Sequence, residues 1–220
     1  MQDQTTLLVS SAPNTASTLD APSQVVEERR QRDKITISDN VLDETCRAKI
    51  FQFLSSGHWY FGWKSNPQRD HLSFWHRHFA GHRKEGQEAP YDCAAELREN
   101  APLLFDFWSA LESAGLKGHT LVRCYANGLP YGCDGTIHTD SFSDHTYTSV
   151  YYPHDQWHPN WGGETVFFNK DVSDVLTAIY PKPNRLLTFS GRLPHVARGV
   201  ARTCPQLRIT LMFKTEFKNG

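Results

Sequence analysis

The segment Leu207-Arg-Ile-Thr-Leu-Met-Phe-Lys-Thr215 is rich in aliphatic, aromatic and β-branched residues and predicts a β-strand near the end of the chain. Similar short runs precede it from residue 119 onward, with Gly, Pro, Asn and Asp between them. About eight short strands separated by turn residues are typical of a double-sheet jelly roll. We therefore expect a mainly β fold with N-terminal helices, of the double-stranded β-helix type. The expected strands lie near residues 119–126, 136–140, 146–152, 164–168, 174–180, 185–190, 195–200 and 207–215.

The chain of 220 residues is long enough for one domain with a single sizeable core. Residues 1–33 are rich in Ser, Thr, Ala, Pro and Gln, and we expect them to form a flexible N-terminal arm. Residues 34–118 are expected to form a helical support that also contains a substrate loop. Residues 119–220 are expected to form the jelly-roll core, so that residues 34–220 make up one domain.

The helical support begins with the alternating residues 34–38, which predict a short strand. Asp39 or Asn40 is then expected to cap a helix that extends to about Leu54, because both side chains accept hydrogen bonds from a helix N-terminus. Residues 58–63 are aromatic and resemble a strand.

Residues 64–91 are polar, contain many His and Arg residues and several turn formers, and are interpreted mostly as a long loop. Residues 92–113 predict a helix that restarts at Pro102, a residue suited to the first helical turn, and that ends at Gly115. A long loop inside a compact domain is often functional, so the loop is a candidate for substrate contact.

The charge of the chain is nearly balanced, with 23 basic and 24 acidic residues and a formal net charge of −1. This balance gives no reason to expect nucleic acid or an anionic membrane as a partner. We also expect no membrane-spanning helix and no secretory signal. A reducing, cytoplasmic location is expected, because the five cysteines are odd in number and scattered, unlike a disulfide framework or a zinc knuckle: Cys46, Cys93, Cys124, Cys133 and Cys204.

The strongest local signal is the segment Gly135-Thr-Ile-His-Thr-Asp140. On a strand, residues two apart point to the same face, so His138 and Asp140 can reach one point. The segment Ser190-Gly-Arg-Leu-Pro-His195 can bring a second His from a distant strand. Two imidazoles and one carboxylate on one side of a metal leave the opposite side open, which suits iron(II). Such a short pattern also occurs by chance, and its weight here comes from the surrounding sequence.

Several segments around this signal occur in an order and spacing that are specific when taken together. They are Arg123-Cys-Tyr-Ala-Asn127, His138-Thr-Asp140, Val150-Tyr-Tyr-Pro153, Trp161-Gly-Gly-Glu-Thr165, Leu186-Leu-Thr-Phe-Ser-Gly-Arg-Leu-Pro-His195 and Arg208-Ile-Thr-Leu211. The run from about His119 to Lys214 thereby resembles the prolyl-hydroxylase-like branch of the iron(II)/2-oxoglutarate oxygenases. The resemblance implies an enzyme that uses Fe(II), 2-oxoglutarate as co-substrate and O₂. It also implies that His138, Asp140 and His195 are the metal ligands.

By the same resemblance, Arg208 receives the distal carboxylate of 2-oxoglutarate, and a guanidinium fork fits a carboxylate with two hydrogen bonds. Thr210 lies two residues further, on the same strand face, and can add a hydroxyl donor. The family pattern implies a co-substrate contact for Tyr152 and contacts near the metal for Tyr125 and Tyr131. Core packing is an equally good interpretation of Tyr125 and of Tyr152.

The register of the last strand leaves one alternative open. The interval between His195 and Arg208 is longer than we expect for the prolyl hydroxylases, and Arg198 and Arg202 fall within it. Either of these two arginines would take the role of Arg208 if the register differs. Lys at this place is common among the prolyl hydroxylases, so the substrate class stays open.

A substrate-binding wall is expected from residues 63–82, which form a lid over the metal in this interpretation. Loops of this kind are where a scaffold often places recognition, and Arg can clamp a carboxylate. We therefore predict a substrate with a negatively charged group. The alternative is that the segment is a solvated surface loop. The candidate substrate-binding residues are Arg69, Trp75, Arg77, Arg123 and Arg192.

The sequence as a whole predicts oxidation of an unactivated C–H bond. Hydroxylation is the default outcome, with desaturation or cyclisation as further outcomes, and the substrate is a small molecule, an amino acid or a peptidyl residue. Two alternatives remain at this point. One is a non-catalytic metal-binding jelly-roll module, and the other is a cupin-type dioxygenase that does not use 2-oxoglutarate.

Overall fold

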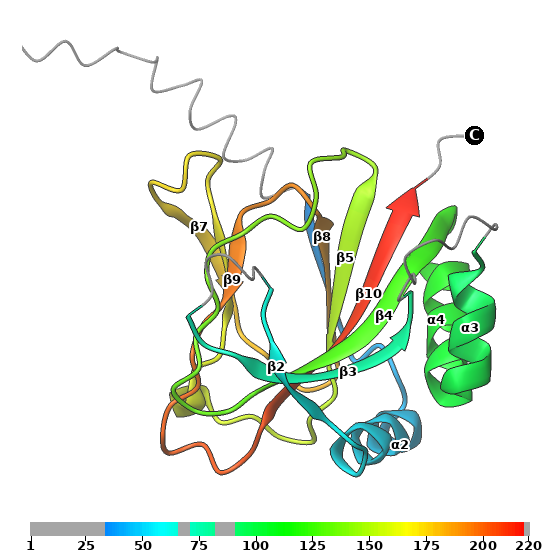
Figure 1. Cartoon of the computed structure of the whole chain (residues 1–220), viewed down its shortest axis with the longest axis horizontal. Coiled ribbons are helices and arrows are strands. Elements are labelled where there is room, and N and C mark those ends of the chain that lie inside the picture. The colour runs from blue at the N-terminus through cyan, green and yellow to red at the C-terminus, as the bar shows by residue number, and fades with distance from the viewer. Residues whose placement is uncertain (1–33, 66–70, 82–90, 218–220) are drawn as a thin grey trace, which may run out of the picture.

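The computed structural model describes residues 34–65, 71–81 and 91–217, so the expected arm over residues 1–33 lies outside the described residues. The described part of the chain forms two antiparallel sheets, which confirms the double-sheet jelly roll (Figure 1). The smaller sheet contains β7 (Val175–Ile179), β6 (Thr165–Phe168) and β9 (His195–Ala197). The larger sheet runs in the order β1 (Ile35–Asp39), β8 (Arg185–Ser190), β5 (Thr146–Tyr152), β10 (Arg208–Phe217), β4 (His119–Leu129), β3 (Phe74–Ala80) and β2 (Tyr60–Trp63).

Three α-helices support the larger sheet: α2 (Glu44–Ser55), α3 (Cys93–Asn100) and α4 (Pro102–Ala114), and a short 3-10 helix η1 (Pro159–Trp161) precedes β6. In Figure 1, α3 and α4 lie beside β4 and β10, on the side away from β7 and β9. None of the helices in the described residues combines the length and apolar composition needed to cross a lipid bilayer.

The start of α2 differs from the expected cap at Asp39 or Asn40. Asp43 is the N-cap, and its carboxylate accepts a hydrogen bond of 2.9 Å from the backbone N–H of Cys46. Asp39 instead ends β1, where its carboxylate binds the Arg185 side chain at 2.7 Å. An aspartate held by a cation from β8 is not available to a helix N-terminus, which is why the helix begins later than predicted.

The segment interpreted as a long loop contains a strand that the sequence prediction missed. β3, from Phe74 to Ala80, pairs with β4 and extends the larger sheet. Polar residues occur on both faces of this strand, with Phe74 and His76 on one side and Arg77 on the other. The sequence therefore does not show the alternation of apolar and polar residues that is typical of a strand. The expected strand at 136–140 is also different, because within it only His138 forms a bridge.

The alternation of β10 divides the core into two layers. Leu211 and Phe213 are buried against the helices, in the cluster that contains Leu104 and Trp108. Met212 points the other way and packs between the two sheets. The same face of β10 lines the cavity between the sheets with Arg208, Thr210, Met212 and Lys214.

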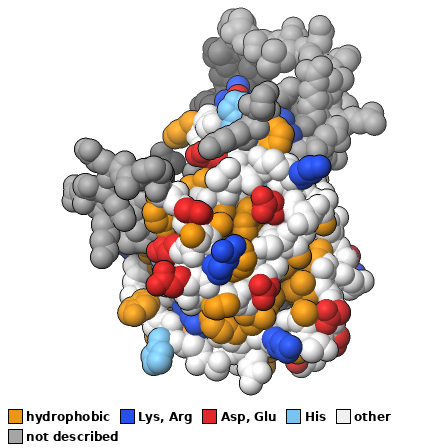
Figure 2. All heavy atoms as spheres, turned by 90° about the vertical axis from the view of Figure 1, so that its right-hand side faces the viewer, with side chains coloured by type: hydrophobic (Ala, Val, Ile, Leu, Met, Phe, Trp, Pro, Cys, Tyr) orange, Lys and Arg blue, Asp and Glu red, His pale blue; other side chains and the backbone are white. Residues whose placement is uncertain are grey.

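The outer surface of the α3 and α4 layer carries mixed charge. Figure 2 shows this face with acidic and basic side chains scattered among apolar and uncharged ones. The exposed acids on the two helices include Glu99, Asp106 and Glu112. Neither sign of charge dominates this surface of the helical layer.

Candidate metal centre and its cavity

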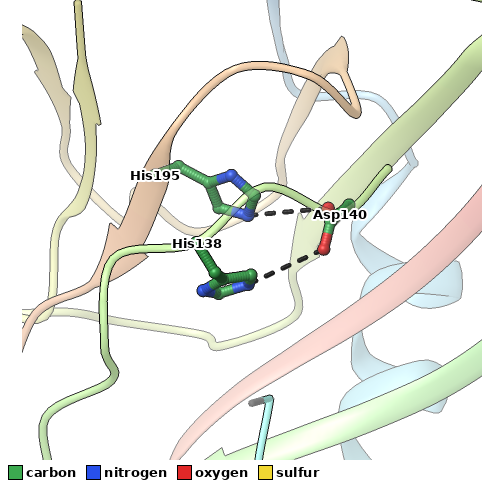
Figure 3. Close-up of side chains that lie close together, drawn as sticks. All are labelled: His138, Asp140 and His195. Carbon is green, nitrogen blue, oxygen red and sulfur yellow. Dashed lines mark ion pairs between the residues drawn. The ribbon is translucent and has the colours of Figure 1, made fainter. Parts of the chain in front are cut away.

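The three side chains of the predicted metal motif converge at the mouth of the sandwich (Figure 3). His138 and His195 face each other across a backbone bridge, with N–H to carbonyl distances of 3.0 and 2.9 Å. Asp140 is fixed next to them because its backbone N–H donates to the Gly191 carbonyl at 2.8 Å. One candidate ligand atom from each of the three side chains lies within 4.8 Å of the others. The structure thus brings His195 next to His138 and Asp140, which lie on a distant segment of the chain.

Both imidazole rings are oriented by backbone carbonyls. The Nδ1 atom of His138 lies 2.7 Å from the carbonyl of Thr136, and that of His195 lies 2.8 Å from the carbonyl of Leu193. A carbonyl only accepts, so each Nδ1 carries the proton and each Nε2 keeps its lone pair. The two Nε2 atoms face the Asp140 carboxylate at 3.7 and 3.5 Å. Two imidazole lone pairs beside one carboxylate fit a divalent transition-metal ion.

The charges of this cluster follow from burial and from one cation. Burial lowers the pKa of His195 to about 4, so the ring stays neutral, as a metal ligand must. Burial would raise the pKa of Asp140, but the nearby charge of Lys214 and the two histidines hold it well below its usual range. Asp140 is therefore a carboxylate in the metal-free protein.

Lys214 and Thr148 are two residues of the centre that the sequence analysis did not identify. The ammonium group of Lys214 contacts the Oδ2 atom of Asp140. The hydroxyl of Thr148 donates to the same oxygen at 2.6 Å and accepts from Lys214 at 2.9 Å. Burial would lower the pKa of Lys214, but Asp140 and Tyr125 raise it, so the side chain stays charged. Lys214 lies an even number of residues after Arg208 on the same strand, and this spacing could have placed both side chains on the cavity face.

A cavity of about 390 Å³ extends from this cluster into the sandwich. Its walls come from β4, β5 and β10 of the larger sheet and from β6 and β9 of the smaller one. The size lies in the range of small-molecule sites in proteins. Arg208 and Thr210 line the same cavity as the three clustered side chains.

Arg208 is a buried cation without a buried acid. Its side chain is only 1% exposed, and its Nε donates to the Gly163 carbonyl at 2.6 Å. An Nη2 contact of 3.3 Å to the Thr165 hydroxyl adds a second partner. Among the residues that the structure describes, no Asp or Glu forms an ion pair with it. Such a charge is expensive to bury unless a ligand supplies the anion. The two alternative arginines, Arg198 and Arg202, are exposed.

The two glycines before β6 make room for Arg208. Gly162 and Gly163 have φ values of 65° and 79°, where a side chain is rarely tolerated. A Cβ atom on Gly163 would lie 2.9 Å from the Arg208 Cδ atom. This turn therefore needs glycine both for its backbone shape and for the close approach of the arginine.

The predicted co-substrate tyrosines divide into two groups. Tyr152 is fully buried, and its hydroxyl lies 2.8 Å from that of Thr165, next to Arg208. Tyr125 lines the cavity and is buried as well. Tyr131 is 59% exposed and does not line this cavity within the described residues.

Of the predicted substrate residues that the structure describes, Arg123 alone lines the cavity. Arg77 lies on the opposite face of β3, where it donates to the carbonyl of Phe53 at 2.8 Å and to that of Leu54 at 3.0 Å. Trp75 shares that opposite face. Arg192 is on the surface and pairs with Asp144 at 2.6 Å. Arg69 lies outside the described residues, so the expected lid over 63–82 is described only in part.

Arg123 sits between two aromatic rings at the cavity wall. Its guanidinium carbon lies 5.0 Å from the ring centre of Trp63 and 4.7 Å from that of Tyr125. Its Nε is buried without a hydrogen-bond partner. Trp63 also stacks on His76 at 4.1 Å, so the wall combines flat rings with a positive charge. Trp63 was predicted only as the start of the lid.

Comparison with known proteins agrees with this geometry. Residues 122–214 match the model of the 2OG-Fe(II) oxygenase superfamily, in which 2OG stands for 2-oxoglutarate. The matched segment begins one residue before Arg123 and ends at Lys214, and it contains all three clustered side chains and Arg208. No curated protein sequence gives a significant match to the chain.

Solved structures with a similar fold include three oxygenase-type proteins. One is a prolyl hydroxylase from Trichoplax adhaerens, solved with a peptide fragment of the hypoxia inducible factor oxygen degradation domain. It has a TM-score of 0.56 and 17% identity, and the alignment covers 91% of this chain and 94% of the hydroxylase chain. A Pseudomonas putida prolyl-4-hydroxylase has a TM-score of 0.53 and 15% identity, with coverages of 89% and 99%. HygX from Streptomyces hygroscopicus, solved with nickel and 2-oxoglutarate bound, has a TM-score of 0.55 and 10% identity, with coverages of 86% and 86%. At these identities, the likeness establishes the fold.

Proposed function

We propose that the chain is an enzyme of the 2OG-Fe(II) oxygenase superfamily, whose model matches residues 122–214 and whose enzymes need iron(II), 2-oxoglutarate and O₂. The reaction that we propose is hydroxylation of an unactivated C–H bond of an anionic substrate. When bound, the iron supplies the oxidising chemistry together with 2-oxoglutarate and O₂. In the overall reaction, one oxygen atom of O₂ enters succinate and the other enters the product, and CO₂ is released. Desaturation or cyclisation would use the same residues.

We assign the iron to His138, Asp140 and His195. The support for this assignment is the pair of Nε2 lone pairs that face the carboxylate at 3.7 and 3.5 Å. The backbone bridge places the two histidines side by side, and the carbonyls of Thr136 and Leu193 orient their rings, so the protein itself positions the proposed ligands.

The single observation that carries the proposal is Arg208, a fully buried guanidinium that shares one cavity with the metal cluster and forms no ion pair with an acid of the described residues. It would bind the distal carboxylate of 2-oxoglutarate, and the Thr210 hydroxyl on the same strand face would add a donor. The Tyr152 ring lies 5.6 Å from the guanidinium carbon and closes the space behind it. A cupin-type dioxygenase without 2-oxoglutarate has no use for such a receptor.

We propose that Arg123 receives the negative group of the prime substrate. It lies on the cavity wall between Trp63 and Tyr125, and no Asp or Glu of the described residues pairs with it. A flat, aromatic-lined wall with one guanidinium suits a carboxylate attached to an apolar body. Small acids, amino acids and peptidyl residues all fit this description.

The test is the turnover of the co-substrate. Purified protein loaded with iron(II) under nitrogen is given 2-oxoglutarate and then air, and succinate is measured by mass spectrometry with a panel of acidic amino acids, peptides and small organic acids. Iron-dependent succinate that rises with one class of candidate and is absent without protein supports the proposal. A protein that binds iron but forms no succinate with any candidate, or without one, contradicts it.

A further inference from the structure

Lys214 is the part of the metal cluster whose role the proposed function leaves unexplained. It lies on β10 opposite Arg123 of β4, and both cations point into the cavity. Like charges directly opposite each other on a sheet destabilise it. A second cation at this place therefore needs a compensating anion, and Asp140 is that anion.

Lys214 is held by two groups of the protein at the metal cluster. Its ammonium group contacts Oδ2 of Asp140 and the hydroxyl of Thr148, the latter at 2.9 Å. Two of the three N–H donors of the ammonium group therefore point to groups of the protein itself. The side chain is 18% exposed, which leaves the charge largely shielded from water.

The two oxygens of Asp140 are treated differently by these neighbours. Oδ2 receives both Lys214 and the 2.6 Å hydrogen bond from Thr148. Among the residues that the structure describes, the group that faces Oδ1 is the ring of His138, whose Nε2 lies 3.7 Å away, beyond hydrogen-bond distance. The protein thus occupies one oxygen and leaves the other to a metal.

We propose that Lys214 is a built-in counter-charge of the metal centre, a positioning residue that neutralises Asp140 before the metal binds and that weakens the hold of the centre on the ion. The inference rests on the proposed assignment of His138, Asp140 and His195 as the ligands. A fixed positive charge next to the carboxylate stabilises the metal-free site and repels an incoming divalent cation. The charge of Lys214 should therefore raise the stability of the metal-free protein and lower its affinity for the metal. A residue that only packs would raise the stability without lowering the affinity.

The test compares Lys214→Met with the wild type, using Mn²⁺ as a redox-stable probe and isothermal titration calorimetry. Methionine keeps the length of the side chain and removes its charge. We expect the metal-free variant to unfold at a lower temperature and to bind Mn²⁺ at least about tenfold more tightly than the wild type. Thr148→Val is the matched control, since it removes a neutral donor from the same oxygen, and its Mn²⁺ affinity should change less than about threefold.

Three outcomes separate the inference from the proposed function. If wild-type protein does not bind Mn²⁺, or if His195→Ala binds it as well as the wild type, the ligand assignment itself is wrong. If the assignment holds but Lys214→Met binds Mn²⁺ with equal or lower affinity, the counter-charge role is overturned. Lys214→Gln, which keeps polarity without charge, gives the same comparison if the methionine variant does not fold, and unchanged affinity in the glutamine variant equally overturns the role.

Discussion

Arg208 and Lys214 project from the same face of β10 into one cavity, but only Lys214 has an acidic partner. Lys214 is neutralised by Asp140 within the protein, whereas the guanidinium of Arg208 is held by the carbonyl of Gly163 and the hydroxyl of Thr165. The strand therefore presents one satisfied charge at the metal cluster and one unsatisfied charge deeper in the sandwich. A dicarboxylate such as 2-oxoglutarate is suited to the space between them, with one end at the metal and the other at Arg208.

The three proposed ligands should be individually indispensable. His138→Ala, Asp140→Ala and His195→Ala are each expected to abolish iron-dependent succinate formation and to leave a folded protein, because each loses one donor of a three-donor set. Activity is measured at limiting iron, and folding by circular dichroism. Wild-type activity in any one of the variants at limiting iron would remove that residue from the ligand set.

Loss of the Arg208 guanidinium should act on the co-substrate. Arg208→Ala is expected to raise the KM for 2-oxoglutarate by an amount worth roughly 2–5 kcal/mol, the cost of removing one partner of a buried charge pair. The exposed Arg198 and Arg202 serve as controls, and alanine at either position should leave this KM unchanged. A large defect in Arg202→Ala with none in Arg208→Ala would assign the carboxylate to the other arginine.

Arg123 and Arg192 should differ in their effect on the prime substrate. Arg123→Met is expected to raise the KM for an anionic substrate while the KM for 2-oxoglutarate changes little, since Arg123 lies on the cavity wall. Arg192→Met is the matched surface control, because that guanidinium pairs with Asp144. Equal substrate KM values for the two variants and the wild type would mean that the anion is bound elsewhere, as would a substrate that proves to be neutral.

Arg77 should contribute to stability and not to catalysis. Its guanidinium donates to two carbonyls at the end of α2 and lies 4.9 Å from the ring centre of Phe53. Arg77→Met is expected to lower the free energy of unfolding by roughly 1–3 kcal/mol, because the carbonyls lose their donor. Urea unfolding measures the loss, and both KM values should stay at wild-type levels. If the variant is as stable as the wild type but has a raised KM for the prime substrate, Arg77 contributes to substrate binding after all.

His154 should make the metal-free protein acid-sensitive. Burial, followed by the charge of Arg208, lowers its pKa from 6.5 to about 4. The unfolded chain therefore takes up a proton at about pH 6.5 that the folded protein accepts only near pH 4. The free energy of unfolding should fall as the pH drops through this window, by up to roughly 3 kcal/mol, and stay level above it.

The control for this pH dependence is His154→Gln, whose amide can still accept the 3.0 Å hydrogen bond from the N–H of Ile209. Urea unfolding in EDTA at pH 7.5 and at pH 4.5 should show a smaller difference for the variant than for the wild type. His195 has a pKa shift of the same direction and remains in both proteins, so a residual slope is expected. An identical slope in the two proteins would contradict the role of His154.

The sequence predicted the jelly roll because its strands from residue 119 onward are apolar and bounded by turn formers. Arg208 was identifiable because a charge in such an apolar strand requires a partner. β3 was missed because its alternating residues include His76 and Arg77, which imitate a polar loop, and its strand character depends on the edge that β4 offers. Pairing across the sheet is a long-range property that a local pattern does not contain.

The predicted substrate arginines also show that a local sequence pattern does not determine which face of a sheet a side chain occupies. Arg77 and Arg123 have the same charge but lie on opposite faces of the larger sheet. Arg77 pairs with Ala126, which is buried in the helix-side cluster, whereas Arg123 lines the cavity. The sequence did not predict Lys214 as a residue of the site, because a lysine near the end of a strand is usually exposed to solvent. Its role depends on Asp140, which reaches it from a segment that the sequence does not place beside β10.

The backbone bridge between His138 and His195 also has a consequence for folding fidelity. Because side chains alternate along a strand, a slip of one residue at the start of β9 would turn His195 away from His138 and Asp140 and place Val196 beside them instead. A misaligned chain would bury a similar amount of apolar surface and would still lack a working centre. If His138, Asp140 and His195 bind the metal as proposed, the ion would stabilise only molecules with the correct pairing between residue 138 and β9, and metal binding would select the correctly folded chain.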